Sequence, residues 1–254
     1  MRIASWNVNS LRVRLEQVID WLERDPVDVL ALQETKLTDE KFPVEAVEAA
    51  GYRCSFVGQK TYNGVAVLTR DPPADVVMAL PGSDDPQQRF IAVTVGGVRV
   101  VNVYVPNGEA VDSDKYAYKL NWLSTLNAFL TDEMKQYPEL VLLGDFNIAP
   151  ADDDVYKPER WKDKVLCSEP ERTALNDLLA LGLVDTFREF EQEPATYSWW
   201  DYRFNGFKRN AGLRIDLVLA SEALNARCTS STVDPAPRAL ERPSDHAPAV
   251  AEFD

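Results

Sequence analysis

Cysteine and histidine are scarce in this chain of 254 residues, which has three cysteines, Cys54, Cys167 and Cys228, and one histidine, His246. The cysteines lie far apart and form no CxxC pair, so neither a disulfide framework nor a cysteine-ligated zinc site is indicated. We expect all three to be small apolar side chains in a reducing compartment. Any imidazole chemistry must take place at His246.

Long apolar segments and flexible linkers are also absent. No run approaches the roughly 18 apolar residues that a membrane span needs. The N-terminal segment MRIASWNVNS has no apolar run after its arginine, so it does not resemble a secretory signal peptide. We therefore expect a cytoplasmic protein without a membrane partner. Because no Gly/Ser-rich or Pro-rich linker divides the sequence, we expect residues 1–254 to form one domain.

Positive charge is in deficit, with 27 Lys and Arg against 41 Asp and Glu and a formal net charge of −14. This balance excludes a protein that coats nucleic acid through a globally basic surface. Two segments, 1–15 and 203–214, nevertheless contain basic residues and no acidic ones. They predict local contacts to a phosphate backbone, with surplus acids such as those at 152–154 lying elsewhere. The basic residues of the second segment are Arg203, Lys208, Arg209 and Arg214.

Short runs of aliphatic and β-branched residues alternate with helical patterns. They predict strands at 29–32, 64–68, 90–95, 98–105, 140–143, 215–219 and 247–253, and helices at 15–22, 119–130 and 175–181. Gly96-Gly97 predicts a tight hairpin between two strands, and Gly182 predicts the end of a helix. Such a mixture predicts a layered α/β fold with a mixed sheet rather than a pure βαβ array.

Many of the apolar runs begin or end in polar residues that core packing would not select. These residues are Asn7, Asn9, Glu34, Tyr104, Asn107, Asp145, Asn147, Asp216, Asp245 and His246. Ligands of layered α/β folds bind in the crevice beyond the strand ends, where side chains leave the core on a rigid base. Any one of the ten could be a turn or cap residue, but together they predict a functional site.

Carboxylates and amides without cysteine ligands predict an all-oxygen metal site, suited to Mg²⁺ or to Mn²⁺. Glu34 is the strongest metal candidate, because a carboxylate directly after a buried strand needs a counter-charge. Asp245 is the next candidate. Pairing of Glu34 with a lysine or arginine is the alternative, and the sequence leaves both open.

A single histidine is more often a structural residue than a catalyst, but His246 directly follows an acidic residue, Asp245. Neighbours on an extended segment point to opposite sides, so Asp245 is poorly placed to orient the imidazole, and Asp216 is the better candidate. In this hypothesis His246 accepts a proton from water that attacks a phosphorus atom. Asn147 would donate to a phosphoryl oxygen, and Asp145 would orient the nucleophile or transfer a proton.

These residues lie in segments that resemble one known family. The chain contains, in the order and approximate spacing of the exonuclease III class of apurinic/apyrimidinic endonucleases, the segments WNVNSLR, ALQETK, NGVAVLTR, YVPNG, GDFNIAP, YSWWDYR, GLRIDLVLAS and RPSDHAPAV. The resemblance implies a four-layer α/β sandwich with two central mixed sheets flanked by helices. It also implies Mg²⁺-dependent hydrolysis of the phosphodiester 5′ to an abasic site in duplex DNA. Varying amounts of 3′→5′ exonuclease and 3′-phosphodiesterase activity would accompany it.

The resemblance further implies roles for individual residues. It implies metal and phosphate contacts at Asn7, Glu34, Asp145, Asn147, Asp245 and His246. It implies catalytic positions also at Tyr104 and Asp216, a phosphate contact at Asn107, and an indirect contribution from Asn9, where some members have Asp. Either Asp145 or His246 would be the main proton acceptor.

Selectivity for an abasic site would come from an apolar pocket. Trp199, Leu213 and Ile215 align with the family's pocket for a flipped-out, base-free deoxyribose, which would exclude an intact nucleotide. Trp199 and Trp200 are neighbours on a predicted strand, so one of them is expected to be a core aromatic. Arg203 is a further candidate contact to the substrate.

Two other functions compete with this hypothesis. A phosphatase or phospholipase acting on a small phosphorylated molecule would share parts of the site, but the segments YSWWDYR and GLRID favour a repair enzyme. A DNA-binding protein without catalytic activity would be expected to have lost some of the ionisable and amide residues, all of which are present. We therefore expect a monomeric hydrolase acting on double-stranded DNA with abasic sites or blocked 3′ ends.

Overall fold

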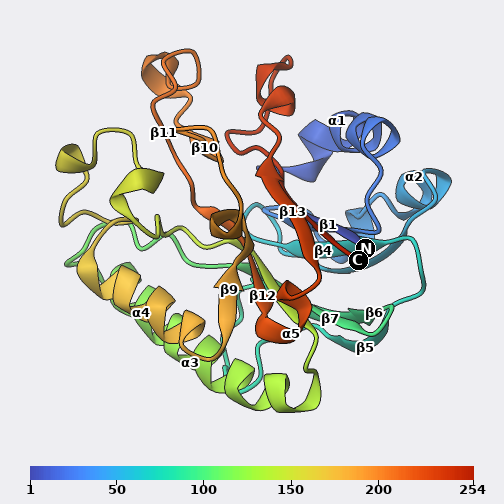
Figure 1. Ribbon diagram of the computed structural model, residues 1–254. Helices are drawn as coiled ribbons and strands as arrows, with labels where there is room; N and C mark the ends of the chain where they lie inside the picture. The colour runs from blue at the N-terminus through green and yellow to red at the C-terminus, as the bar shows by residue number, and fades with distance from the viewer.

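Two six-stranded sheets form the centre of the computed structural model, which describes residues 1–254 (Figure 1). The first has the strand order β13-β14-β1-β2-β4-β3, and the second has the order β5-β6-β7-β8-β12-β9. The first sheet comprises β1 (Arg2–Asn7), β2 (Val29–Gln33), β3 (Arg53–Val57), β4 (Val65–Thr69), β13 (Cys228–Val233) and β14 (Ala249–Phe253). The second comprises β5 (Ala74–Val77), β6 (Phe90–Val95), β7 (Val98–Tyr104), β8 (Leu140–Asp145), β9 (Leu183–Asp185) and β12 (Asp216–Ser221). A separate two-stranded ribbon consists of β10 (Trp199–Trp200) and β11 (Gly212–Leu213).

The chain also contains five α-helices, the first four of which cover the outer faces of the sheets. They are α1 (Leu11–Arg24), α2 (Val44–Ala49), α3 (Asp114–Gln136), α4 (Glu169–Leu179) and α5 (Glu222–Asn225), with 3₁₀ turns at Asp39–Lys41, Asp152–Asp154, Pro158–Arg160, Thr186–Glu189, Arg203–Asn205 and Ala236–Ala239. One apolar cluster packs α1 and α2 on the first sheet, and another packs α3 and α4 on the second. Figure 1 shows these two helix pairs on opposite sides of the sheets. None of the helices combines the length and apolar character needed to span a bilayer.

The two sheets pack on each other through their aliphatic inner faces. Ile3 and Val29 of the first sheet share one buried cluster with Val93 and Val141 of the second. The next residue along β1, Ala4, belongs instead to the cluster beneath α1, because successive side chains of a strand face opposite sides. The result is a helix, sheet, sheet, helix arrangement, which confirms the predicted four-layer α/β sandwich.

The predicted elements are present, and four of the strands that were missed share one property. Each predicted strand lies within two residues of its observed ends, and both glycines of the predicted Gly96-Gly97 hairpin have positive φ, 58° and 86°. The helices α3 and α4 begin earlier than predicted, at N-cap residues Ser113 and Ser168. The interior strand β1, the ribbon strand β11 and the short helices α2 and α5 were outside the predicted ranges. The strands β3, β5, β9 and β13 were also not predicted, and they are the four edges of the two sheets. Edge strands carry exposed residues and so lack a continuous apolar run.

Strand direction gathers the polar residues at one end of the sandwich. β1 runs parallel to β2, and β7 runs parallel to β8, so the carboxyl ends of each pair lie together. β12 is antiparallel to β8, and its first residue, Asp216, pairs with Asp145. Gly144 precedes Asp145 at φ 147°, where a Cβ atom would lie 1.9 Å from the carbonyl oxygen of Val103. Only glycine therefore allows β8 to approach β7 this closely at the end that carries Asp145.

The expectation that Arg214 contributes to a phosphate-binding stretch is wrong. Its side chain is 1% exposed, and its guanidinium binds Asp154 Oδ1 (2.6 Å) and Asp185 Oδ2 (2.7 Å). Asp154, counted among the surplus surface acids, is equally buried and also pairs with Arg188. The guanidinium of Arg214 is planar and offers several donors, so it can bind two carboxylates at once, and Arg188 supplies the second positive charge. The charges of Arg214, Asp154 and Asp185 therefore stabilise the fold and are not available to a ligand.

Replacement of Arg214 with Met should lower the free energy of unfolding by about 3–5 kcal/mol, because Asp154 would keep its charge in the core without its main partner. Urea unfolding followed by circular dichroism measures this loss. Lys208→Met is the matched control, since Lys208 lies exposed on the same segment and should change stability by no more than about 0.5 kcal/mol. Equal unfolding midpoints for the two variants would contradict the structural role of Arg214.

Candidate active site

Three ionisable side chains converge where the polar ends of the two sheets meet. Glu34, Asp145 and His246 each place one ligand atom within 4.8 Å of the others. Glu34 follows β2 of the first sheet, and Asp145 ends β8 of the second. Asn7, the last residue of β1, donates from Nδ2 to Glu34 Oε1 (2.9 Å) and to Asp145 Oδ2 (2.9 Å). One amide therefore joins carboxylates from both sheets.

This group has the donor chemistry of a divalent metal site. Two carboxylates with an imidazole beside them, and no thiolate, favour a hard cation held mainly by oxygen. Lys36 Nζ lies 2.7 Å from Glu34 Oε2, so its ammonium offsets part of the negative charge. Glu34 thus has the lysine partner of one alternative, and it also faces Asp145 and His246, as the metal alternative requires. The residues present fit a bound divalent cation.

The structure confirms Asp216 as the partner of His246. The ring atom Nδ1 of His246 lies 2.8 Å from Asp216 Oδ2, and both side chains are buried. The other ring nitrogen, Nε2, faces Asp145 Oδ2 at 3.8 Å. Ser198 Oγ donates to the same Asp216 oxygen at 2.6 Å and accepts the main-chain N–H of Asp216 at 3.0 Å. The imidazole is therefore held in one orientation between two carboxylates.

Burial and charge together move the pKa values of this pair. Burial opposes the charged imidazole, but the carboxylates of Asp216 and Asp145 outweigh it and raise the pKa of His246 to about 10. Burial raises the pKa of Asp145 to about 7, against the opposing effect of the His246 charge. At neutral pH the metal-free site therefore holds a cationic imidazole beside a carboxyl group that is poised to gain or lose a proton.

Asn147 and Asn107 form a linked pair of amides beside Asp145. The main-chain N–H of Asn147 donates to Asp145 Oδ1 (2.9 Å) in a turn where Asn147 has a φ of 50°. Its Nδ2 donates to Val105 O (3.1 Å), and its Oδ1 accepts from Asn107 Nδ2 (2.9 Å). Asn147 is buried whereas Asn107 is exposed. The pair thus extends from the buried carboxylate to solvent, as a phosphate-binding role requires.

Asp245 lies next to the convergent group but outside it. Its two carboxylate oxygens accept from Asn9 Nδ2 (2.8 Å) and from Trp199 Nε1 (3.0 Å). Burial opposes its charge, but His246 and these two donors outweigh it and hold the pKa of Asp245 below its usual range. Asn9 in turn accepts from Lys36 Nζ at 2.6 Å. Asp245 and Asn9 therefore connect the site to Trp199 and to Lys36.

The two neighbouring tryptophans face opposite ways, as predicted. Trp200 is buried in a cluster with Phe187 and Tyr197, so it is the core aromatic of the pair. Trp199 is half-buried and packs against the cluster that contains Leu213 and Ile215, each 1% exposed. The three apolar residues predicted to form a pocket are therefore in one cluster, with Trp199 at its accessible edge.

The remaining two candidates differ in position. Tyr104 ends β7 beside Asp145, and the guanidinium of Arg89 lies 4.6 Å from the centre of its ring. Burial raises the pKa of Tyr104, and the charges of Glu34 and Asp145 raise it further, so the phenol keeps its proton. Arg203 is exposed and bound to Asp201, with a shortest contact of 2.6 Å, and the structure does not bring it to the convergent group.

Sequence reasoning missed three supporting residues. Ser198, which orients Asp216, precedes the two tryptophans in the segment YSWW, so its position in that motif was the available signal. Gln33 and Asn102 form a buried hydrogen bond of 2.7 Å between the two sheets. Asn102 also donates to the carbonyl oxygen of Leu32 at 3.0 Å. These amides lie within apolar strands, and no spacing in the sequence distinguishes them from residues that face solvent.

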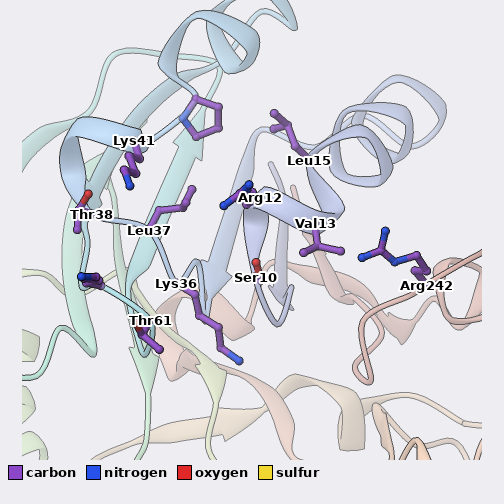
Figure 2. Close-up of a pocket in the computed structure, with 12 residues that line it drawn as sticks. Ser10, Arg12, Val13, Leu15, Lys36, Leu37, Thr38, Lys41, Thr61 and Arg242 are labelled. Carbon is purple, nitrogen blue, oxygen red and sulfur yellow. The ribbon is translucent and has the colours of Figure 1, made fainter.

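A basic groove adjoins the convergent group (Figure 2). It has a volume of about 1100 Å³ and lies between the start of α1 and the segment that follows β2. Lys36 belongs to both the groove and the site. No acidic side chain lines the groove, and its basic residues are Arg12, Lys36, Lys41, Lys60 and Arg242. Of the arginines in residues 1–15, Arg12 alone lines this groove.

A family model for the Endonuclease/Exonuclease/phosphatase family matches residues 4–246. The chain belongs to this family. Over its full length it is 37% identical to exodeoxyribonuclease III of Haemophilus influenzae, and the alignment covers 100% of both proteins. This membership confirms the resemblance inferred from the motifs. The protein is a hydrolase with the DNA-repair nuclease function of its branch of the family, whose members depend on a metal ion.

Two solved structures of family members match the fold closely. A 3′ phosphatase from Neisseria, determined with a product DNA hairpin, is 54% identical, with a TM-score of 0.98 and coverage of 100% of this chain and 99% of the other. An AP endonuclease from Archaeoglobus fulgidus is 39% identical, with a TM-score of 0.96 and the same coverage of both chains. The predicted sandwich fold is therefore confirmed by two family members whose described activities differ.

Because His246 is the sole histidine, its imidazole signals in an NMR spectrum are unambiguous. In the metal-free protein the ring should stay protonated through neutral pH and lose its proton near pH 10. Asp216→Asn removes a carboxylate that favours the imidazolium, so the pKa of His246 should fall in that variant. A wild-type ring that titrates near the ordinary value of about 6.5 would contradict the charge state derived from the structure.

Proposed function

We propose that this nuclease hydrolyses the phosphodiester 5′ to abasic sites in duplex DNA and also removes blocking groups from 3′ ends, with Mg²⁺ as its metal. The observation that carries the proposal is the buried group of Asn7, Glu34, Asp145, His246 and Asp216 beside a groove that contains only basic charges. The family relatives described as a 3′ phosphatase and as an AP endonuclease support the two halves of the proposal.

Glu34 and Asp145, with Asn7 and His246 close by, would hold the Mg²⁺ ion. When bound, the ion supplies Lewis-acid stabilisation of charge on a phosphate oxygen. We assign proton acceptance to Asp145 rather than to His246, because the Asp145 carboxylate lies at the centre of the group, between Asn7 and His246, whereas the imidazole is held by Asp216. The imidazole, already protonated, would donate a hydrogen bond to a non-bridging phosphoryl oxygen.

The other polar residues would complete the reaction. Asn147 uses one N–H of its amide for Val105, so the second is free to donate to the phosphoryl oxygen. A new bond forms between the water oxygen and phosphorus as the bond from phosphorus to the 3′ oxygen breaks. Tyr104, which keeps its proton, would donate it to the departing 3′ oxygen. Asp216 holds His246 in place throughout.

Substrate contacts would lie on both sides of this centre. The basic groove would bind the phosphate backbone, which explains how a chain with a net charge of −14 can bind DNA. Trp199, with Leu213 and Ile215 behind it, would contact a base-free sugar and disfavour an intact nucleotide. Both sheets supply site residues, so we propose that residues 1–254 act as one catalytic domain and as a monomer.

A duplex with a single abasic site tests the main proposal, together with a nicked duplex that ends in a 3′ phosphate. With Mg²⁺ we expect incision of the first and release of phosphate from the second, and EDTA should abolish both. Asp145→Asn should lower kcat by about 10²- to 10⁴-fold through loss of the proton acceptor. Glu45→Gln is the control, because it makes the same change from carboxylate to amide at an exposed position on α2. Incision that survives EDTA, or hydrolysis of a small phosphomonoester in preference to DNA, would overturn the proposal.

The same substrates test the sugar pocket. Trp199→Ala should narrow the difference in rate between the abasic duplex and an otherwise identical intact duplex. An unchanged preference would remove Trp199, Leu213 and Ile215 from substrate recognition.

The groove makes a separate prediction about salt. Replacing Lys41 and Lys60 with Gln should weaken DNA binding and reduce the slope of log Kd against log salt concentration by about 2, one for each lost phosphate contact. Fluorescence anisotropy with a labelled duplex gives this slope. Lys135→Gln is the control, because Lys135 lies on α3 in the opposite helical layer. A double variant with the wild-type slope would show that DNA does not occupy the groove.

A further inference from the structure

A buried ion pair lies behind the active site and takes no part in the proposed hydrolysis. Lys119 of α3 and Glu171 of α4 are both 0% exposed, and Lys119 Nζ binds Glu171 Oε1. Burial lowers the pKa of Lys119, whereas the charge and hydrogen bond of Glu171 favour the ammonium form. Burying both charges costs solvation energy that the attraction between them does not always recover. Stability alone therefore does not account for this pair.

The remaining hydrogen bonds of Lys119 lead directly to the site. Its ammonium group donates to the main-chain carbonyl oxygens of Asn147 (2.6 Å) and Asn107 (3.2 Å). With Glu171 as the third partner, all three of its N–H groups are used. Asn107 and Asn147 are the two linked amides that reach from Asp145 to solvent. One ammonium thus fixes the backbone beneath both of them.

Glu171 holds the ammonium in place from the other side. Its Oε1 also accepts the main-chain N–H of Leu166 (3.0 Å), and its Oε2 accepts the main-chain N–H of Ser168 (3.1 Å). The hydroxyl of Ser168 adds a further bond to Oε2. The carboxylate is thus held by the segment that leads into α4 and cannot rotate away from Lys119 without breaking several bonds. The ion pair is a rigid support for the carbonyl oxygens.

Asn147 needs such a support because of its backbone conformation. Its φ of 50° lies in the left-handed region, which costs energy for a residue other than glycine unless its surroundings hold it there. The N–H of Asn147 is fixed by Asp145 Oδ1, and its carbonyl oxygen is fixed by Lys119. Loss of the ammonium would release the carbonyl end of this residue and leave a buried acceptor without its donor.

We propose that Lys119 is a positioning residue that holds the amides of Asn107 and Asn147 in register with the scissile phosphate. It touches neither substrate nor metal, and it acts through the main chain of the two asparagines. This inference rests on the proposed phosphate-binding role of Asn147. It predicts that kcat depends on Lys119 more than KM does, because the amide is needed most when charge builds on the phosphoryl oxygen.

Lys119→Met tests the proposal in a double-mutant cycle with Asn147→Ala. In an otherwise wild-type chain, we expect Lys119→Met to lower kcat on the abasic duplex by about 10- to 100-fold with a smaller change in KM. In the Asn147→Ala background the same substitution should lower kcat less than about twofold, because the amide of Asn147 is gone and Asn107 has lost the Oδ1 atom that its own amide binds. Effects that multiply in the double variant would overturn the proposal.

Arg99→Met is the matched control for lost stability. Arg99 is 1% exposed and binds Glu133 near the opposite end of α3, so this variant also breaks a buried ion pair on that helix. When kcat is measured below the unfolding temperature of every variant, the Arg99→Met enzyme should keep the wild-type value. If Lys119→Met does not fold, Lys119→Arg retains the charge for Glu171 but displaces the donors from the carbonyl oxygens. A folded Lys119→Arg enzyme with wild-type kcat would overturn the proposal.

A measurement without DNA tests the positioning role of Lys119 independently of the proposed substrate. In the ¹⁵N spectrum of the metal-free protein, the side-chain amide signals of Asn107 and Asn147 should shift or broaden in Lys119→Met. Those of Asn127, which lies half-buried farther along α3 and donates to the carbonyl oxygen of Asp177, should not. Unchanged signals from all three asparagines would refute the positioning role, whatever substrate the enzyme cleaves. Perturbed signals in an enzyme that does not incise DNA would refute the substrate alone.

Discussion

The amide of Asn7 lies between two carboxylates that would repel each other if they met without it. Glu34 and Asp145 belong to different sheets, and both accept a hydrogen bond from the same Nδ2 atom at 2.9 Å. Lys36 and His246 supply positive charge on the two outer sides. The close approach of the sheets at this end therefore depends on donors and cations alternating with carboxylates. The same alternation leaves carboxylate oxygens turned toward one another, which is the condition for binding a divalent ion.

Strand ends made much of this site predictable from the sequence. Buried runs that finish in Asn, Glu or Asp are poor choices for packing, and parallel strands bring their carboxyl ends to one edge. The pairing of His246 with Asp216 followed from alternation along an extended chain, and the structure places them 2.8 Å apart. Alternation also separated Trp199 from Trp200. Each of these inferences used local geometry that two or three neighbouring residues determine.

Long-range charge pairing was not predictable in the same way. Arg214 occurs in an acid-free stretch of sequence, yet it is buried against Asp154 and Asp185 from distant segments. Lys119 lies in a helical pattern whose period indicates only that one face is apolar, and Glu171 reads as an N-terminal capping residue. Which cation pairs with which carboxylate depends on how helices and loops pack. A count of charged residues does not distinguish a buried ion pair from charges on the surface. Edge strands escaped prediction for the related reason that their exposed residues hide the apolar pattern.

The distinction between buried and exposed charges also affects how the negative net charge is interpreted. Some of the 41 acidic residues lie inside the molecule, where Glu171 and Asp154 pair with buried cations and where Glu34 and Asp145 face each other. Basic residues meanwhile gather in a groove that no acid lines. A phosphate backbone therefore meets a local field of opposite sign to the whole protein, and beyond about 8 Å at physiological salt that field is screened. Under the proposed function, attraction to DNA is therefore confined to the groove, and selectivity comes from the contacts that the active site makes with the phosphate and the sugar.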